Sequence, residues 1–138
     1  MKWLVGILLS IFFVSPALAE VRITIDLSEQ MMIVDAPVWD TPVYWDVSTA
    51  KKGMTTPTGN FQPTRMEKMH YSSKYENAPM PYSIFFTGGY AIHGTNAISQ
   101  LGKRASHGCV RLHPENARIL FSLVSQYGKD NTFIEIVP

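Results

Sequence analysis

The residues best suited to chemistry in this chain are one thiol and one imidazole, 109 − 93 = 16 positions apart. Cys109 is the only cysteine, and His93 lies upstream of it. Near neutral pH only a few per cent of an ordinary thiol is thiolate, so a catalytic cysteine needs a neighbouring base or positive charge. His93 can be that base, because an imidazole can take the thiol proton and return it to a leaving amine. These two residues predict nucleophilic catalysis.

The residues around the cysteine could complete such a site. Gly108 has no side chain, so the backbone N–H groups around it can approach a substrate carbonyl and form an oxyanion hole. Arg111 has a planar fork of donors that fits a carboxylate. Ser106 and His107 could hold the loop or tune its charge. His107 also competes with His93 as the base, and spacing alone leaves both open.

Three alternatives compete with this interpretation. Ser48-Thr49-Ala50-Lys51 has the S-x-x-K spacing of serine peptidases, but that motif should open a helix and its K-T-G and S-D-N partners are missing. A zinc site could be built from three imidazoles and the thiol, although no H-E-x-x-H pair supports it: His93, His107, Cys109 and His113. We expect no metal and no cofactor. A catalytically silent binding module is the third alternative, in which a lone cysteine is a small buried hydrophobe.

The elements that would position these residues are mostly strands. Residues 21–27 alternate apolar and polar side chains and form the clearest strand. Further strands are expected where β-branched and aromatic residues cluster between turn residues: 31–34, 43–47, 82–86, 90–92 and 132–137. One helix is expected from Pro114, which suits a first turn, to Gly128, which suits a helix end. The prediction is a mainly β domain (β-rich α+β) with sandwich-like mixed sheets and one flanking helix.

The segment from Arg65 to Pro81 interrupts this pattern. It carries scattered charges, several aromatic or polar residues and the cluster Pro79-Met80-Pro81. We expect a long surface loop, and long loops in compact domains are often functional. The loop could cover the cleft.

Residues 1–19 have the three parts of a secretory signal peptide: Lys2, an apolar stretch and Ala17-Leu18-Ala19. We expect cleavage before Glu20, export to the periplasm or cell envelope, and a mature monomer without a membrane anchor. Residues 20–138 are enough for one domain. Their 12 − 1 = 11 basic and 11 acidic residues cancel, which argues against nucleic acid as a partner.

Several motifs of this chain closely resemble the L,D-transpeptidase catalytic domain, the YkuD family. The main signature is His93-Gly94-Thr95, then Gly102 and the run from Ser106 to Leu112. Upstream, 47–49 (Val-Ser-Thr), 56–61 (Thr-Pro-Thr-Gly-Asn-Phe) and 80–82 (Met-Pro-Tyr) also match. The resemblance covers nearly all of the chain after residue 19.

The resemblance implies a cysteine acyltransferase that acts on the tetrapeptide stems of peptidoglycan. The Cys109 thiolate would attack the bond after meso-diaminopimelate, D-alanine would leave, and the amine of a second stem would take the acyl group. His93 would be the base, its ring oriented by a backbone carbonyl, and the amides of His107, Gly108 and Cys109 would bind the oxyanion. Ser106, Gly94, Thr95 and Arg111 would contribute to substrate binding. The same residues would serve an L,D-carboxypeptidase or an exchange enzyme.

Overall fold

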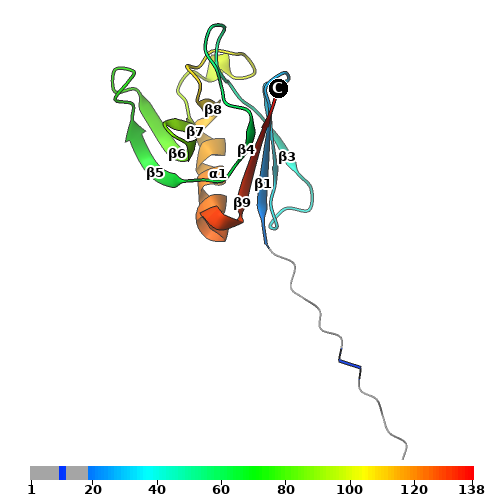
Figure 1. Cartoon of the computed structure of the whole chain (residues 1–138). Coiled ribbons are helices and arrows are strands. Elements are labelled where there is room, and N and C mark those ends of the chain that lie inside the picture. Colours follow the sequence, from blue (N-terminus) through cyan, green and yellow to red (C-terminus); the bar gives the residue numbers. More distant parts are fainter. Residues whose placement is uncertain (1–9, 12–18) are drawn as a thin grey trace, which may run out of the picture.

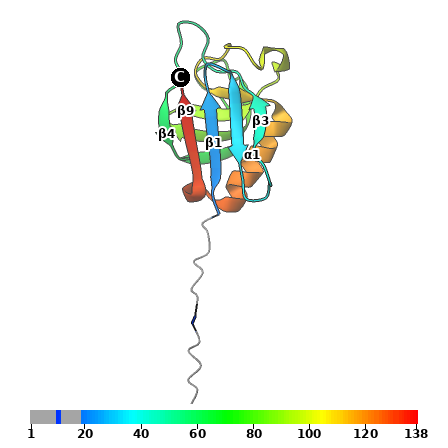
Figure 2. The same cartoon turned by 90° about the vertical axis from the view of Figure 1, so that its right-hand side faces the viewer.

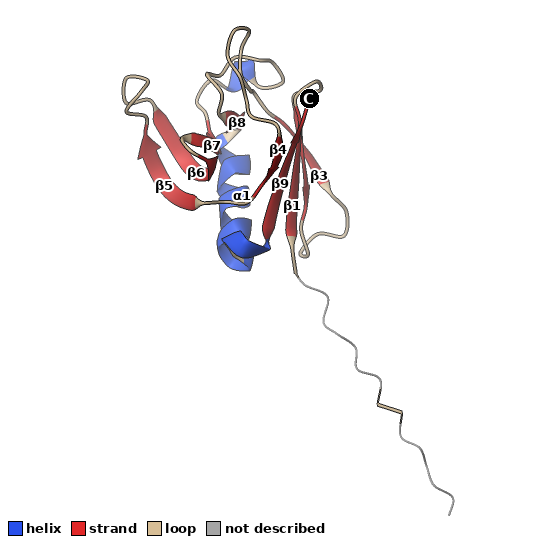
Figure 3. Ribbon diagram, viewed as in Figure 1, coloured by secondary structure: helices blue, strands red, loops and turns tan. Residues whose placement is uncertain are grey.

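The structure is a computed structural model that describes residues 10–11 and 19–138. Two β-sheets and one long helix make up the described part of the chain (Figures 1 and 3). The prediction of a mainly β domain with mixed sheets and a flanking helix is confirmed. The predicted signal peptide and its cleavage site fall almost wholly outside the described residues. In the described part, no helix is both long and apolar enough to cross a membrane.

The first sheet has five strands in the order β3-β2-β1-β9-β4. Its strands are β1 (Val21–Asp26), β2 (Met31–Asp35), β3 (Val43–Asp46), β4 (Gly59–Phe61) and β9 (Thr132–Val137). The first and last strands of the domain, β1 and β9, run parallel at its centre, and the other pairs are antiparallel. Figure 2 views this sheet face-on, with α1 along one side.

The second sheet has the order β5-β6-β7-β8 and carries the candidate site. Its strands are β5 (Arg65–Tyr71), β6 (Pro79–Thr87), β7 (Tyr90–Gly94) and β8 (Val110–Leu112). Helix α1 (Pro114–Tyr127) packs mainly on β6 and β7. It begins at Pro114 and ends before Gly128, as predicted.

The core lies between the two sheets and the helix. Period-2 alternation buries one face of β1, where Val21, Ile23 and Ile25 are at most 1% exposed. Helix α1 buries Leu120 and Val124 against the same core. This apolar interior holds the ends of β7 and β8 in place, which is the part of the fold that matters for chemistry.

The prediction of a long loop from Arg65 to Pro81 was wrong. These residues form β5, a turn over 72–78 and the start of β6. The two prolines suggested a break, but β6 pairs with β7 only from Ile84 onward. The edge of β6 beside Pro79 and Pro81 is therefore open. The two prolines, which lack an N–H group, can face this edge without the loss of a hydrogen bond between strands. In Figure 1 the hairpin, in green, projects away from the first sheet.

Candidate active site

The imidazole lies on β7, and the thiol belongs to the residue immediately before the parallel strand β8. His93 lies on β7 opposite Arg111 of β8, and Ile92 lies opposite Val110. Side chains alternate between the faces of a sheet, so Ile92 and Val110 enter the main core while His93 and Cys109 share the other face. His93 and Cys109 are thus diagonal neighbours, and the 15 intervening residues only return the chain to the start of β8.

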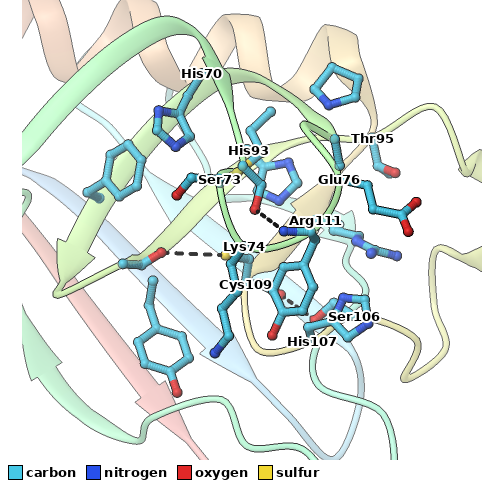
Figure 4. Close-up of a pocket in the computed structure, with 18 of the residues that line it drawn as sticks. His70, Ser73, Lys74, Glu76, His93, Thr95, Ser106, His107, Cys109 and Arg111 are labelled. Atoms are coloured by element: carbon cyan, nitrogen blue, oxygen red, sulfur yellow. Dashed lines mark hydrogen bonds between the residues drawn. The ribbon is translucent and has the colours of Figure 1, made fainter.

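This face opens into a cleft of about 900 Å³, a volume typical of small-ligand sites. The cleft receives side chains from the β5–β6 hairpin, from β7 and from the loop before β8 (Figure 4). Six of the eight predicted site residues line it: His93, Thr95, Ser106, His107, Cys109 and Arg111. The fold therefore brings the predicted thiol and imidazole together in an accessible cleft.

The imidazole of His93 is buried, and one of its ring nitrogens is already engaged. Nδ1 lies 2.7 Å from the carbonyl oxygen of Gly94. A carbonyl only accepts hydrogen bonds, so the proton of neutral His93 sits on Nδ1 and Nε2 carries the free lone pair. The pKa of His93 falls to about 4, mainly because of burial; the hydrogen bond to Gly94 raises it, and the charges of Arg111 and His70 lower it. At neutral pH His93 is an uncharged proton acceptor.

The Cys109 thiol is half-buried beside Met80, Phe85 and Ala91. Burial raises its pKa, although a backbone hydrogen bond from Ala91 and the charge of Arg111 act in the opposite direction. Its sulfur lies 3.9 Å from the carbonyl oxygen of Gly89, a weak contact. Burial therefore disfavours the charged form of both side chains, and with it a thiolate–imidazolium pair.

The loop before β8 is held by a buried hydroxyl. Ser106 Oγ donates to the carbonyl of Cys109 at 2.6 Å and accepts the Gly108 amide at 3.1 Å. Thr56 Oγ1 donates to the carbonyl of Gly108 at 2.9 Å. Gly108 has φ of 143°, and a Cβ there would lie 2.6 Å from a ring carbon of Tyr90. The Gly108 amide is thus already used, whereas the amides of His107 and Cys109 have no hydrogen-bond partner among the described residues.

The charged side chains around the cleft are mainly basic. Arg65, Lys74 and Arg111 line it, against one carboxylate, Glu76. Arg111 donates to the side-chain oxygen of Gln100 at 3.2 Å and forms no ion pair with any described carboxylate. Its guanidinium is therefore available to a carboxylate brought by a ligand.

The second imidazole of the motif has a different environment. The His107 ring stacks on Tyr75 at the tip of the hairpin, with centroids 4.0 Å apart and planes 10° apart. Partial burial and the charges of Lys51, Arg111 and Lys74 lower its pKa. His107 is therefore a contact between the loop before β8 and the hairpin. The sequence pointed to neither Tyr75 nor this contact, because Tyr75 lies in the segment that was predicted to be a loop.

Gly94 ends β7 beside the helix, and Thr95 follows it. A Cβ on Gly94 would lie 3.2 Å from Cα of Pro114 and 3.1 Å from the Pro81 ring, so the missing side chain allows close packing. Gly94 does not line the cleft. Thr95 does, and its hydroxyl accepts the amide of Ala97 at 3.1 Å.

The described residues form neither the serine-peptidase site nor the zinc site that were considered as alternatives. Ser48 is fully buried, donates to the carbonyl of Lys103 at 2.7 Å and forms an isolated bridge with Arg111 in place of opening a helix. His113 caps α1 by accepting the amide of Glu115. Within residues 10–11 and 19–138, no three His, Cys, Asp or Glu side chains are grouped so that they could hold a metal ion.

Known sequences similar to this chain include the L,D-transpeptidase family and two probable L,D-transpeptidases. The L,D-transpeptidase catalytic domain family (YkuD) matches residues 20–136. Probable L,D-transpeptidase YbiS of Escherichia coli strain K12 is 37% identical over 101 residues, which cover 62% of this chain and 30% of that protein. Probable L,D-transpeptidase ErfK/SrfK of the same strain is 34% identical over 96 residues, with the same two coverages. The chain therefore spans about a third of the length of these relatives.

Solved structures share the architecture. An L,D-transpeptidase from Mycobacterium smegmatis superposes with a TM-score of 0.75 at 21% identity, covering 87% of this chain and 59% of that one. The L,D-transpeptidase from Xylanimonas cellulosilytica has a TM-score of 0.69 at 26% identity and covers 89% of this chain and 63% of that one.

Proposed function

The chain belongs to the L,D-transpeptidase catalytic domain family, and from this premise we propose that it is a cysteine-dependent acyltransferase acting on peptidoglycan stem peptides. The observation that carries the proposal is the diagonal placement of His93, on β7, and Cys109, immediately before β8, with both residues lining the cleft. Residues 1–19 would be removed on export, and residues 20–138 would work in the cell envelope as a monomer.

Acylation starts from the neutral pair. As the Cys109 sulfur attacks the carbonyl carbon after meso-diaminopimelate, its proton passes to Nε2 of His93. When the carbon–nitrogen bond breaks, that proton goes to the departing amine of D-alanine, and a thioester remains. The low pKa of His93 favours this return, because the imidazolium gives up its proton readily. The hydrogen bond to Gly94 keeps Nε2 as the acceptor throughout.

The oxyanion of the tetrahedral intermediate needs preorganised donors. We assign them to the amides of Cys109 and His107, because Ser106 already holds the Gly108 amide. Ser106 then acts as a positioning residue. Gly108 contributes the space that a side chain would take from Tyr90. Arg111 and the other basic residues of the cleft suit a substrate with free carboxylates, such as a stem peptide.

The test is to incubate the purified protein with disaccharide-tetrapeptide and to measure the masses of the protein and of the products by mass spectrometry. We expect an adduct on Cys109 and a cross-linked dimer, with both absent in Cys109→Ala and the dimer reduced at least about 100-fold in His93→Gln. A trimmed tripeptide without dimer would indicate a carboxypeptidase. An adduct on Ser48, or no adduct together with normal cell-wall function of Cys109→Ala in cells, would overturn the proposal.

A further inference from the structure

Strand β6 contains a rare backbone conformation at its centre. Tyr82 has φ of 54°, the left-handed region that bulky residues seldom adopt and that carries strain of about 1–3 kcal/mol. The β5–β6 ladder keeps one register on both sides of this point but skips the pair Lys68 and Tyr82. The Tyr82 ring packs edge-on against Phe121 of α1, which holds the conformation in place.

The distortion changes which side chains face the cleft. Met80 and Phe85 are 85 − 80 = 5 positions apart, so regular alternation would put them on opposite faces, yet both pack beside Cys109. Their partners on β5 are His70 and Arg65, and both of these line the cleft. His70 therefore shares the cleft face with Arg65, although the two residues are also five positions apart on their strand.

These β5 side chains form a connected network around one carboxylate. Glu67 accepts from Arg65 at 2.7 Å and lies 2.5 Å from Nδ1 of His70. The guanidinium of Arg65 lies 3.8 Å from the centre of the Phe85 ring, and His70 meets the same ring edge-on. A carboxylate partner fixes the proton of neutral His70 on Nδ1 and leaves Nε2 as an acceptor. The arrangement resembles a base held by a carboxylate and aimed at a substrate.

The proposed reaction has a use for a second base. An acceptor amine arrives as an ammonium ion and must lose two protons before an amide is complete. One leaves before the nitrogen can attack, and the other leaves as the amide forms. His93, with a pKa of about 4, is poorly suited to remove the first from an ammonium ion. His70 and His93 line the same cleft (Figure 4), near enough for the charge of His70 to lower the pKa of His93.

We propose that His70, held by Glu67, is a further catalytic residue, the base that deprotonates the incoming acceptor amine in the second half of the reaction. This inference rests on the proposed function. The first ammonium proton passes to Nε2 of His70 and later to solvent. The neutral nitrogen attacks the thioester carbon, the carbon–sulfur bond breaks, and the second proton restores the Cys109 thiol through His93. Two protons leave the amine, one returns to sulfur and one reaches water.

The experiment separates the two halves of the reaction. The His70→Asn variant keeps a donor for Glu67 but removes the ring nitrogen that accepts protons. Lys68→Gln, on the same strand and outside the cleft, is the matched control. The full-length protein is mixed with tetrapeptide donor, the acyl-enzyme is followed by intact mass, and its decay is timed after addition of an acceptor amine between pH 6 and pH 10.

We expect His70→Asn to form the acyl-enzyme within about twofold of the wild-type rate and to lose about 100-fold in amine-dependent decay at pH 7. The loss should shrink as pH rises, because solution then supplies the neutral amine. Wild-type decay in His70→Asn, or an equal fall of both steps at every pH, would overturn the inference and leave the proposed function intact. A wild-type protein that never forms an acyl-enzyme would remove both.

Discussion

The Nδ1 atom of His93 lies 2.7 Å from the carbonyl oxygen of the next residue, Gly94. This contact fixes the tautomer of a buried ring and points its free lone pair at the cleft. Because the acceptor is the backbone carbonyl of the next residue, no second side chain is needed to orient the imidazole. Its energetic consequences can be measured without any substrate.

The His93 ring should make the stability of the protein depend on pH. Its pKa falls from 6.5 to about 4 on folding, so the unfolded chain binds this proton more tightly. The stabilisation is complete above pH 6.5 and is lost as pH falls toward 4. Between pH 7 and pH 4.5 the free energy of unfolding should drop by about 2 kcal/mol more in the wild type than in His93→Gln. Equal drops in urea titrations at the two pH values would contradict the burial argument.

Cys109 should react as a neutral thiol at rest. Burial raises its pKa, so alkylation by iodoacetamide at pH 7 should be slower than that of an exposed thiol and should rise continuously into alkaline pH. His93→Gln should follow the same profile, since no ion pair is broken. A rate plateau that begins near pH 5 in the wild type and vanishes in His93→Gln would reveal a resting thiolate instead.

Removal of the Ser106 hydroxyl should affect both stability and acylation. Ser106→Ala leaves the buried Gly108 amide without its acceptor, which costs about 1–3 kcal/mol. Ser48→Ala is the matched control, because Ser48 is equally buried and loses one hydrogen bond to Lys103. Both variants should unfold at lower urea concentration, but only Ser106→Ala should acylate at least about tenfold more slowly, which corresponds to about 1.4 kcal/mol. An equal loss of acylation rate in Ser48→Ala would contradict a special role of Ser106.

A comparison of alanine variants at two glycines should distinguish the cost of backbone strain from the cost of a steric clash. Gly102 and Gly108 both have positive φ, but only at Gly108 would a Cβ meet neighbours, at 2.6 Å from Tyr90 and 2.9 Å from the Thr55 carbonyl. Gly102→Ala should therefore destabilise by about 1 kcal/mol through strain alone. Gly108→Ala should lose about 3 kcal/mol and most of its acylation rate. If thermal or urea unfolding gave similar stability losses for the two variants, the loop would have shifted to relieve the clash at Gly108.

The stack between Tyr75 and His107 should help to form the cleft wall. Aromatic pairs of this kind contribute about 0.5–1.5 kcal/mol. Tyr75→Ala should raise KM for the donor peptide about 3- to 10-fold with a smaller change in kcat, and Tyr75→Phe should behave as wild type. Unchanged kinetics in Tyr75→Ala would count against a role of the hairpin tip in binding.

Local pattern was enough to predict much of this protein. Strand β9 and helix α1 were placed within a residue of their observed ends, because period-2 alternation, Pro114 and Gly128 act over short distances. The reactive groups of Cys109 and His93 are intrinsic to their residue types, so the sequence could also nominate them as candidates. The short strands β4 and β8 were missed, since three residues carry too little periodic signal.

Only the tertiary structure decided how those residues are arranged and charged. Burial sets the pKa of His93 and of Cys109, and burial is a property of packed neighbours that are distant in the chain. The hairpin was invisible because its pairing is between strands, and its alternation is reversed by one strained residue, Tyr82. His70 could not be found from the sequence either, because its place in the cleft depends on the pairing of β5 with β6.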